Sequence, residues 1–288
     1  MSIHRVLWKN LFLPITDLLL NTRIRRCRRL LEKTQWLSPG EIERLQLARL
    51  RGIVSHAYRT VPYYRCLFRQ IGLRPEEIKD LSDLDKIPLL TREILSSKNK
   101  TIVSTSYHSA RASQEHTSGT TVIPVPFLRD KSDRSWGLAA ALRAYSWAGY
   151  EMGDKEAQVW ASASIDRNRL LGYLYDKARR TLLIDATGFS TKRMGQILNE
   201  LEEFDPDFIR GYSGALHHIA EELHKTGRVL KARGIISTAS LLHERQREVM
   251  RESFGGPVFD FYGSREVMAM AAECEERSGL HILSLIHI

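Results

Sequence analysis

Residues 116–124, His-Thr-Ser-Gly-Thr-Thr-Val-Ile-Pro, gather hydroxyl side chains around one glycine. Gly119 allows the backbone to turn tightly and to approach a ligand closely. Successive backbone N–H groups in such a turn form a concavity that suits an anion. The hydroxyls of Ser118, Thr120 and Thr121 add further donors to the same concavity. This combination suits the binding of nucleotide phosphates.

The chemistry of this stretch has a second interpretation, which is a polar surface turn. Clusters of Ser, Thr and Gly are common in ordinary loops. The stretch is not a Walker-type loop, because it lacks the Gly-Lys-Ser/Thr ending. The residue types alone therefore leave both interpretations open.

A second segment, residues 261–266 (Phe-Tyr-Gly-Ser-Arg-Glu), strengthens the nucleotide interpretation. Residues 117–124 resemble the phosphate-binding loop of adenylate-forming enzymes, and residues 261–266 resemble the Tyr-Gly-Ser/Thr-x-Glu segment of the same superfamily. Those enzymes join a carboxylic acid to AMP and then usually to a thiol. Segments 61–65, 87–91 and 272–274 are similar to the phenylacetate–CoA ligase-like branch, which includes coenzyme F390 synthetase and CapK proteins.

The resemblance implies a ligand set and a role for each matching residue. ATP, Mg²⁺ and coenzyme A are the implied cofactors, and a small carboxylic acid is the implied substrate. Thr121 and Glu266 match catalytic positions, and Glu266 also matches the magnesium ligand. The matching nucleotide-binding positions are Thr117, Ser118, Gly119, Thr120, Thr121, Thr238, Ala239, Ser240, Tyr262, Gly263 and Ser264.

Several of these residues have a simpler interpretation. Glu266 could be an exposed residue at the start of a helix, where the dipole favours a carboxylate. Tyr262 could stack on adenine or be an aromatic residue at a strand end. Val122 stands where many relatives have glycine, and valine disfavours a positive φ. Ser240 stands where many have glutamate. Val122 and the absence of the family's lid favour the alternative, a non-catalytic nucleotide- or partner-binding homologue. A peripheral membrane-associated protein of polysaccharide biosynthesis is the other alternative.

The periodicity between residues 101 and 288 alternates between strands and helices, which predicts βαβ units and a mostly parallel sheet flanked by helices. Ligands bind at the carboxyl ends of strands in such sheets, so loops 211–214, 237–240 and 262–266 are expected to converge. The predicted strands are 157–161, 181–185, 207–211, 233–237 and 258–262. The predicted helices are 130–147, 191–204, 213–226 and 242–254.

Residues 1–100 are predicted to form a helical N-terminal cap. Ser38, with Glu41 three residues later, forms a capping box that starts a helix. Its expected buried stripe is Ile42, Leu45, Ile53, Val54 and Ala57. The resemblance implies that residues 101–288 form the nucleotide-binding region of a large N-terminal domain. The resemblance implies that this region is incomplete, because it stops before the family's C-terminal lid domain.

Charge and composition describe a globular protein with a basic surface. The 288 residues are 43% hydrophobic and 27% charged, with a net charge of +9. Five arginines fall within residues 23–29, which is typical of a solvated helix face. No nucleic-acid-binding motif accompanies them, so nucleic acid is not an expected partner. Three widely separated cysteines fit a reducing compartment, so a cytoplasmic location is expected.

The N-terminal apolar segment, residues 11–20, is broken by Pro14, Thr16 and Asp17 and is too short to span a membrane. Followed by the arginine cluster, it could make a weak contact with a membrane surface. Packing as an ordinary helix is the alternative. The sequence leaves the oligomeric state open, a homodimer included.

Overall fold

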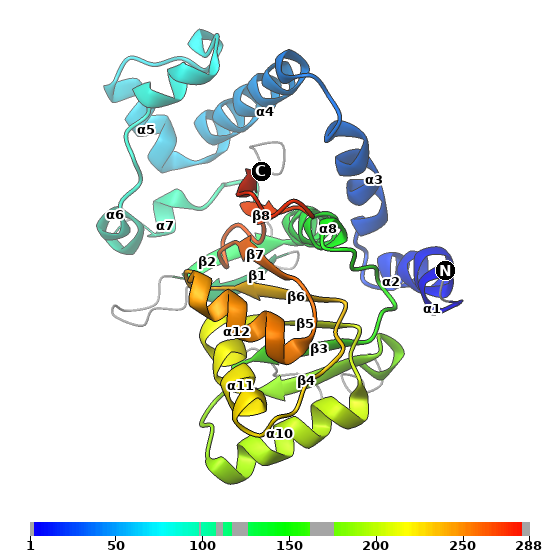
Figure 1. The fold of residues 1–288 in the computed structure, drawn as a ribbon. Helices are drawn as coiled ribbons and strands as arrows, with labels where there is room; N and C mark the ends of the chain where they lie inside the picture. Colours follow the sequence, from blue (N-terminus) through cyan, green and yellow to red (C-terminus); the bar gives the residue numbers. More distant parts are fainter. Residues whose placement is uncertain (1–2, 98, 108–111, 117–125, 162–175, 284–288) are drawn as a thin grey trace.

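The structure is a computed structural model that describes residues 3–97, 99–107, 112–116, 126–161 and 176–283. Figure 1 shows a central sheet with helices on both faces, and the N-terminal helices as separate arms around it. The predicted α/β fold with a mostly parallel sheet flanked by helices is confirmed.

The main sheet has the strand order β4-β3-β5-β6-β7-β8-β9. β3 to β7 are all parallel, and β8 and β9 follow β7 as antiparallel strands. Burial on both faces suits the apolar sequences of the central strands. The strands are β3 (Glu156–Trp160), β4 (Thr181–Asp185), β5 (Phe208–Tyr212), β6 (Gly234–Thr238), β7 (Val258–Tyr262), β8 (Ala271–Glu273) and β9 (Leu280–Ile282).

Helices α10 (Thr191–Phe204), α11 (Ser213–Lys225) and α12 (Glu244–Phe254) cover one face of the sheet. Their apolar stripes share one core, in which Ile197, Ile219 and Met250 are fully buried. The apolar residues of α10 at helical spacing, Met194, Ile197, Leu198 and Leu201, all lie in this core. These three helices therefore hold one face of the sheet in place.

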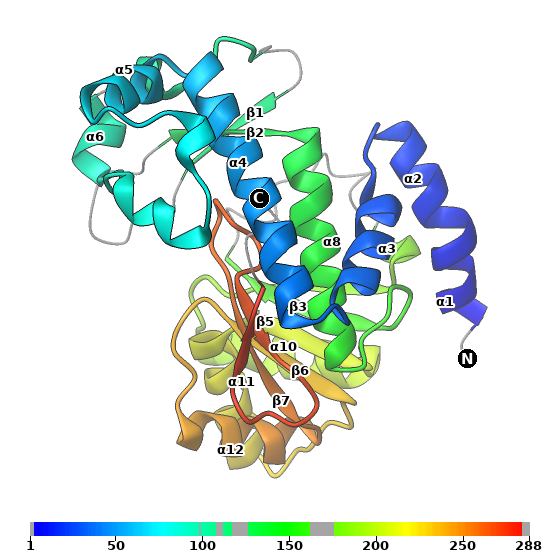
Figure 2. The same ribbon diagram turned by 90° about the horizontal axis from the view of Figure 1, so that it is seen from above.

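Helix α8 (Lys131–Trp147) covers the other face. Asp130 begins it by accepting a hydrogen bond from the Asp133 backbone N–H at 2.7 Å. A run of buried alanines, from Ala139 to Ala141, lets the helix lie close to Phe208 and Phe261 of the sheet. α3 (Ile24–Thr34) packs on the outer side of α8 (Figure 2).

The N-terminal part is helical, as predicted. α4 begins at the predicted capping box, where the Glu41 carboxylate accepts from the Ser38 N–H at 2.8 Å. The other N-terminal elements are α1 (Ile3–Leu7), a π-helical turn η1 (Trp8–Phe12), α2 (Leu13–Leu19), α4 (Pro39–Thr60), α5 (Pro62–Gln70), η2 (Pro75–Glu77), η3 (Leu81–Lys86), α6 (Arg92–Ser97) and α7 (Asn99–Ile102). Among the described residues, no helix is both long and apolar enough to cross a membrane.

The predicted buried stripe of α4 was wrong at Ile53, which is 46% exposed, while Leu50 is 5% exposed. The two halves of the helix pack on different clusters. Ile42 and Leu45 join the core under α8, whereas Leu50 and Val54 join a separate cluster with α5. Because these clusters meet different sides of α4, no single stripe is buried along its length, and Ile53 lies between them.

Candidate functional site

The carboxyl ends of β5, β6 and β7 lie at one edge of the sheet, because these strands are parallel neighbours. Thr238, the last residue of β6, pairs with Tyr212 on one side and with Phe261 on the other. The loops that follow these strands therefore start side by side. This edge is called the carboxyl edge below.

Two buried hydroxyls join the first two of these loops. Ser213 and Ser237 are both fully buried, and the Ser237 hydroxyl donates to Ser213 Oγ at 2.7 Å. Ser213 Oγ in turn reaches the carbonyls of Thr238 and Ser240, each at 3.0 Å. The residue between those carbonyls, Ala239, has a φ of 74°. A non-glycine residue in this region is strained, so the Ser213 hydroxyl holds a strained loop in place.

The third loop presents its charged residues on a tight turn. The Ser264 N–H donates to the Val267 carbonyl at 2.8 Å, and the Val267 N–H donates to Ser264 Oγ at 3.0 Å. Arg265 and Glu266 are the two central residues of this turn, and both are exposed. No helix begins at Glu266, which removes the helix-start interpretation of that residue. Its carboxylate makes no ion pair with any described residue.

Tyr262 ends β7 with 57% of its surface exposed, so its ring is open to a ligand. The next residue must be glycine for a local reason. A Cβ on Gly263 would lie 2.2 Å from the carbonyl oxygen of Met268. Gly211 on β5 is under the same constraint, because its Cβ would lie 2.5 Å from the Val159 carbonyl oxygen. Both glycines are thus required by close backbone packing at the carboxyl edge.

The predicted phosphate loop joins two strands of a separate antiparallel hairpin, β1 (Ala112–His116) and β2 (Pro126–Asp130). Residues 117–125 lie outside the described residues, and with them Thr117, Ser118, Gly119, Thr120 and Thr121 of the predicted set. The flanking residues His116 and Pro126 are paired across the hairpin. His116 itself is exposed.

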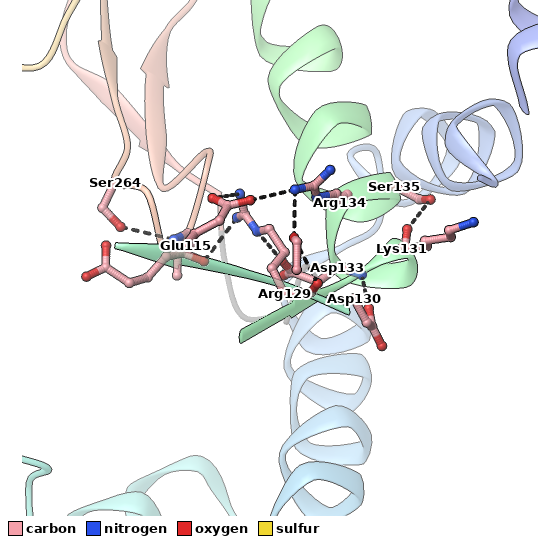
Figure 3. A network of polar contacts seen from close by, with 11 residues as sticks. Glu115, Arg129, Asp130, Lys131, Asp133, Arg134, Ser135 and Ser264 are labelled. Carbon is pink, nitrogen blue, oxygen red and sulfur yellow. Dashed lines mark hydrogen bonds and ion pairs between the residues drawn. The ribbon is translucent and has the colours of Figure 1, made fainter. Parts of the chain in front are cut away.

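Arg129 of β2 links this hairpin to the carboxyl edge (Figure 3). Its side chain is 5% exposed and forms ion pairs with Asp133 of α8 and, at 3.5 Å, with Glu115 of β1. One Nη also donates to the backbone carbonyl of Glu266 at 3.4 Å. Arg134 holds the other side of Glu115 at 2.9 Å. The hairpin, α8 and the Glu266 turn are therefore cross-linked by one guanidinium.

Sequence reasoning did not select Arg129 or Glu115. The available signal was their diagonal position in the hairpin, since opposite charges at diagonal positions attract each other. Ser213 was placed in the converging loop 211–214 and at the start of a helix, with no role for its hydroxyl. A hydroxyl directly after a buried strand, next to another such strand ending in Ser-Thr, was the available hint.

An ion-pair cluster lies on β3 and β5, on the face of the sheet that α8 covers. Glu156 begins β3 and is 1% exposed, and its carboxylate accepts from Arg210 Nε at 2.7 Å. Although burial opposes ionisation, the guanidiniums of Arg210 and Arg179 hold the pKa of Glu156 below its ordinary value. Arg210 also stacks over the ring of Tyr145 at 4.7 Å. This cluster joins β3, β5 and α8. It also approaches the carboxyl edge, because Arg210 lies 5.6 Å from the ring of Trp160, which packs on Tyr212 at 4.9 Å.

The described residues contain no group of three or more side chains suited to bind a metal ion. A single free carboxylate, such as that of Glu266, suits Mg²⁺ when the other ligands are phosphate oxygens and water. The charged part of the site therefore fits a metal that arrives with a phosphate ligand.

Comparison with known proteins gives the fold a name. No family model matches the chain. The chain is 28% identical over 261 residues to the phenylacetate–coenzyme A ligase of Pseudomonas putida, covering 86% of this chain and 57% of that protein. It is 28% identical over 260 residues to the enzyme of the same name from Escherichia coli K12, covering 85% and 57%. The chain thus spans little more than half the length of these relatives.

Among solved structures, a 2-hydroxyisobutyryl-CoA ligase in an open conformation, in complex with 2-HIB-AMP and CoA, superposes with a TM-score of 0.66. It is 18% identical and covers 85% of this chain and 55% of that chain. The fold is that of the N-terminal domain of adenylate-forming enzymes. The sequence relatives support placement in the same superfamily.

In the adenylate-forming fold of this chain, the predicted site residues divide into two groups. Thr238, Ala239, Ser240, Tyr262, Gly263, Ser264 and Glu266 all lie on the loops of the carboxyl edge. The hairpin that leads to residues 117–121 is held to that edge through Arg129. That these residues bind a nucleotide stays a prediction.

Proposed function

We propose that the protein activates a carboxylic acid as an acyl-adenylate at the expense of ATP and then transfers the acyl group to coenzyme A. The observation that carries this proposal is the likeness to phenylacetate–coenzyme A ligases over 85% of the chain. The grouping of the matching segments at the carboxyl edge supports it. We place the protein in the phenylacetate–CoA ligase-like branch, with CapK proteins and coenzyme F390 synthetase, and infer a cytoplasmic location.

The chemistry needs positioning and charge stabilisation more than covalent participation by the protein. A carboxylate oxygen attacks the α-phosphorus of ATP, and pyrophosphate leaves. The thiol of coenzyme A then attacks the acyl carbon of the mixed anhydride, AMP leaves, and the thiol proton passes to solvent. Backbone N–H groups and hydroxyls of residues 117–121 would hold the phosphates, with Thr121 beside the reacting group.

The exposed residues of the carboxyl edge have matching roles in this proposal. Tyr262 would stack its open ring on the adenine. Residues 238–240 would lie between the adenine and the acyl group. Glu266 would hold Mg²⁺, which neutralises phosphate charge when bound. The rigid turn from Ser264 to Val267 keeps that carboxylate at a fixed place relative to Tyr262.

A non-catalytic nucleotide-binding protein is the second candidate. The sequence departures at Val122 and Ser240 favour it, because glycine and glutamate are common at the matching positions of the family. Ser240 is exposed beside the strained Ala239, so the residue type changes without disturbing the loop. The two candidates share nucleotide binding and differ in turnover.

Calorimetric titration with ATP and Mg²⁺, followed by pyrophosphate release with a panel of carboxylic acids and coenzyme A, tests the proposal. Glu266→Gln should weaken Mg²⁺-dependent ATP binding at least about tenfold, which corresponds to about 1.4 kcal/mol. Glu275→Gln, an exposed glutamate in the β8–β9 turn, is the matched control and should bind as the wild type does.

Each outcome of this experiment decides between the candidates. Binding with acid-dependent pyrophosphate release supports the ligase. Binding without release for any acid, when the complete reading frame is assayed, supports the non-catalytic protein. If the folded chain binds neither ATP nor AMP, or if Glu266→Gln and Glu275→Gln behave alike, the proposed site is wrong.

A further inference from the structure

The N-terminal helices expose a continuous apolar stripe, here called the N-terminal stripe. It consists of Ile3, Leu7, Leu11, Ile15 and Leu18, which are 74%, 38%, 47%, 43% and 81% exposed. Leu19 and Leu20 extend it at the end of α2, at 78% and 55% exposed. Most soluble surfaces carry apolar side chains singly rather than in such a row.

The geometry of the helices puts these residues on one face. A spacing of four residues drifts around a regular α-helix, because one turn takes 3.6 residues. The wider π-helical turn η1 lies in the middle of the segment and offsets this drift. The stripe therefore runs straight along the outside of α1, η1 and α2, which form an outer edge of the molecule in both views (Figures 1 and 2).

The opposite face is firmly attached to the protein. Trp8 and Leu13 are 3% and 5% exposed, and Trp8 Nε1 donates to the Ala178 carbonyl at 3.0 Å. Arg5 forms an ion pair with the buried Asp154 at 2.6 Å. The contacts that attach this segment to the protein are therefore made by its other face, and the stripe takes no part in them.

The charged residues of the segment that carries the stripe, and of α3 after it, are almost all positive. Residues 1–31 contain seven Lys and Arg and one acidic residue, Asp17. The Asp17 carboxylate is occupied, because it accepts from the backbone N–H groups of Ile24 and Arg25 at 2.9 and 3.0 Å. Within the described part of the chain, the exposed side chains of Lys9, Arg23, Arg26 and Arg29 form no ion pairs.

We propose that α1, α2 and α3 dock the protein on an anionic lipid surface, with the N-terminal stripe in the interface and the free arginines at the headgroups. An apolar helix face next to Lys and Arg is the composition of interfacial helices. The stripe is built from leucine and isoleucine, whereas hot spots of protein interfaces favour Trp, Tyr and Arg in shaped pockets. This proposal is independent of the proposed ligase activity.

Vesicle co-sedimentation tests the proposal, using phosphatidylcholine vesicles with and without phosphatidylglycerol. The wild-type chain should bind the anionic vesicles, and the bound fraction should fall in high salt. Leu18→Glu with Leu19→Glu should reduce binding at least tenfold, and so should Arg23→Glu with Arg26→Glu and Arg29→Glu. Leu89→Glu is the matched control, because Leu89 is 88% exposed on the distant helical arm and should leave binding unchanged.

The variants change exposed side chains, so their melting temperatures should stay close to that of the wild type. Absence of wild-type binding to anionic vesicles overturns the proposal. So does equal loss of binding in Leu89→Glu and in the Leu18→Glu, Leu19→Glu pair. Sedimentation velocity without lipid tests whether a second copy of the chain covers the stripe instead. If the wild type is a dimer that Leu18→Glu dissociates, and vesicles are not bound, the stripe is an interface between two copies and the proposal is wrong.

Discussion

Replacing Ser213 by alanine removes the hydroxyl that joins two loops of the carboxyl edge. In the structure this hydroxyl accepts from Ser237 and lies within hydrogen-bonding distance of the Thr238 and Ser240 carbonyls. All of these contacts are lost at once in Ser213→Ala, and no other described side chain replaces them. The loop around Ala239 then loses the hydrogen bonds that hold it, at a position where the backbone is strained.

The magnitude follows from the groups left without partners. A buried polar group that loses its hydrogen bond costs about 1–3 kcal/mol. Ser213→Ala strands the fully buried Ser237 hydroxyl and weakens two carbonyl contacts, so we expect a loss of about 2–3 kcal/mol. In a chain of this size, that loss lowers the melting temperature by about 4–10 °C.

Urea denaturation and calorimetric ATP titration measure the two consequences separately. Ser253→Ala is the matched control, because Ser253 is equally buried but donates only to the Ala220 carbonyl, at 2.8 Å and away from the carboxyl edge. The control should cost about 1 kcal/mol and leave nucleotide affinity unchanged. If Ser213→Ala costs no more than Ser253→Ala, the hydroxyl does not hold the strained loop.

Three further substitutions test other contacts. Arg210→Met should cost about 3 kcal/mol at pH 7, because it leaves the buried Glu156 carboxylate with the more distant Arg179 as its one cationic partner among the described residues. In the wild type the lowered Glu156 pKa stabilises the fold above about pH 4.3 and this is lost as the pH falls. In the variant burial raises that pKa, so the deficit should shrink toward pH 5; equal deficits by urea denaturation at both pH values would contradict this. Arg129→Leu should cost about 1–3 kcal/mol, discounted because its acidic partners are partly solvated, and should speed amide exchange in β1 and β2; unchanged exchange would show that the hairpin is held by other contacts. Ala239→Val should cost about 2 kcal/mol at its positive φ, whereas Ala239→Gly should stay within about 1 kcal/mol of the wild type; thermal melts that rank glycine below valine would refute the strain.

Local pattern was enough to predict most of the sheet and its helices. The ranges predicted for β4, β7 and α10 match the structure residue for residue, because alternation and helical spacing are properties of a short window. The same reasoning failed at Ile53, where tertiary contacts on two sides of α4 decide what is buried. The sequence of one helix does not show how many hydrophobic clusters the helix packs against.

The candidate site was less accessible to sequence reasoning. Residues 238–240 and 262–266 were placed at strand ends because parallel strands bring their carboxyl ends together. The positive φ of Ala239, the turn at Ser264 and the reach of Arg129 to the Glu266 carbonyl depend on contacts between distant segments. Such contacts follow from the folded backbone, and residue types alone do not specify them.

The two glycines at the carboxyl edge also limit how this surface can change during evolution or engineering. A Cβ at Gly211 or Gly263 would collide with a backbone carbonyl rather than with a movable side chain. Every substitution there must therefore displace a strand or the segment before β8, and libraries at these positions should return almost exclusively glycine. Residues 239–241 and 265–266 are exposed next to them. Among the described residues of the edge, variation in what it binds therefore falls on these exposed loop positions and on Tyr262, beside two glycines that cannot vary.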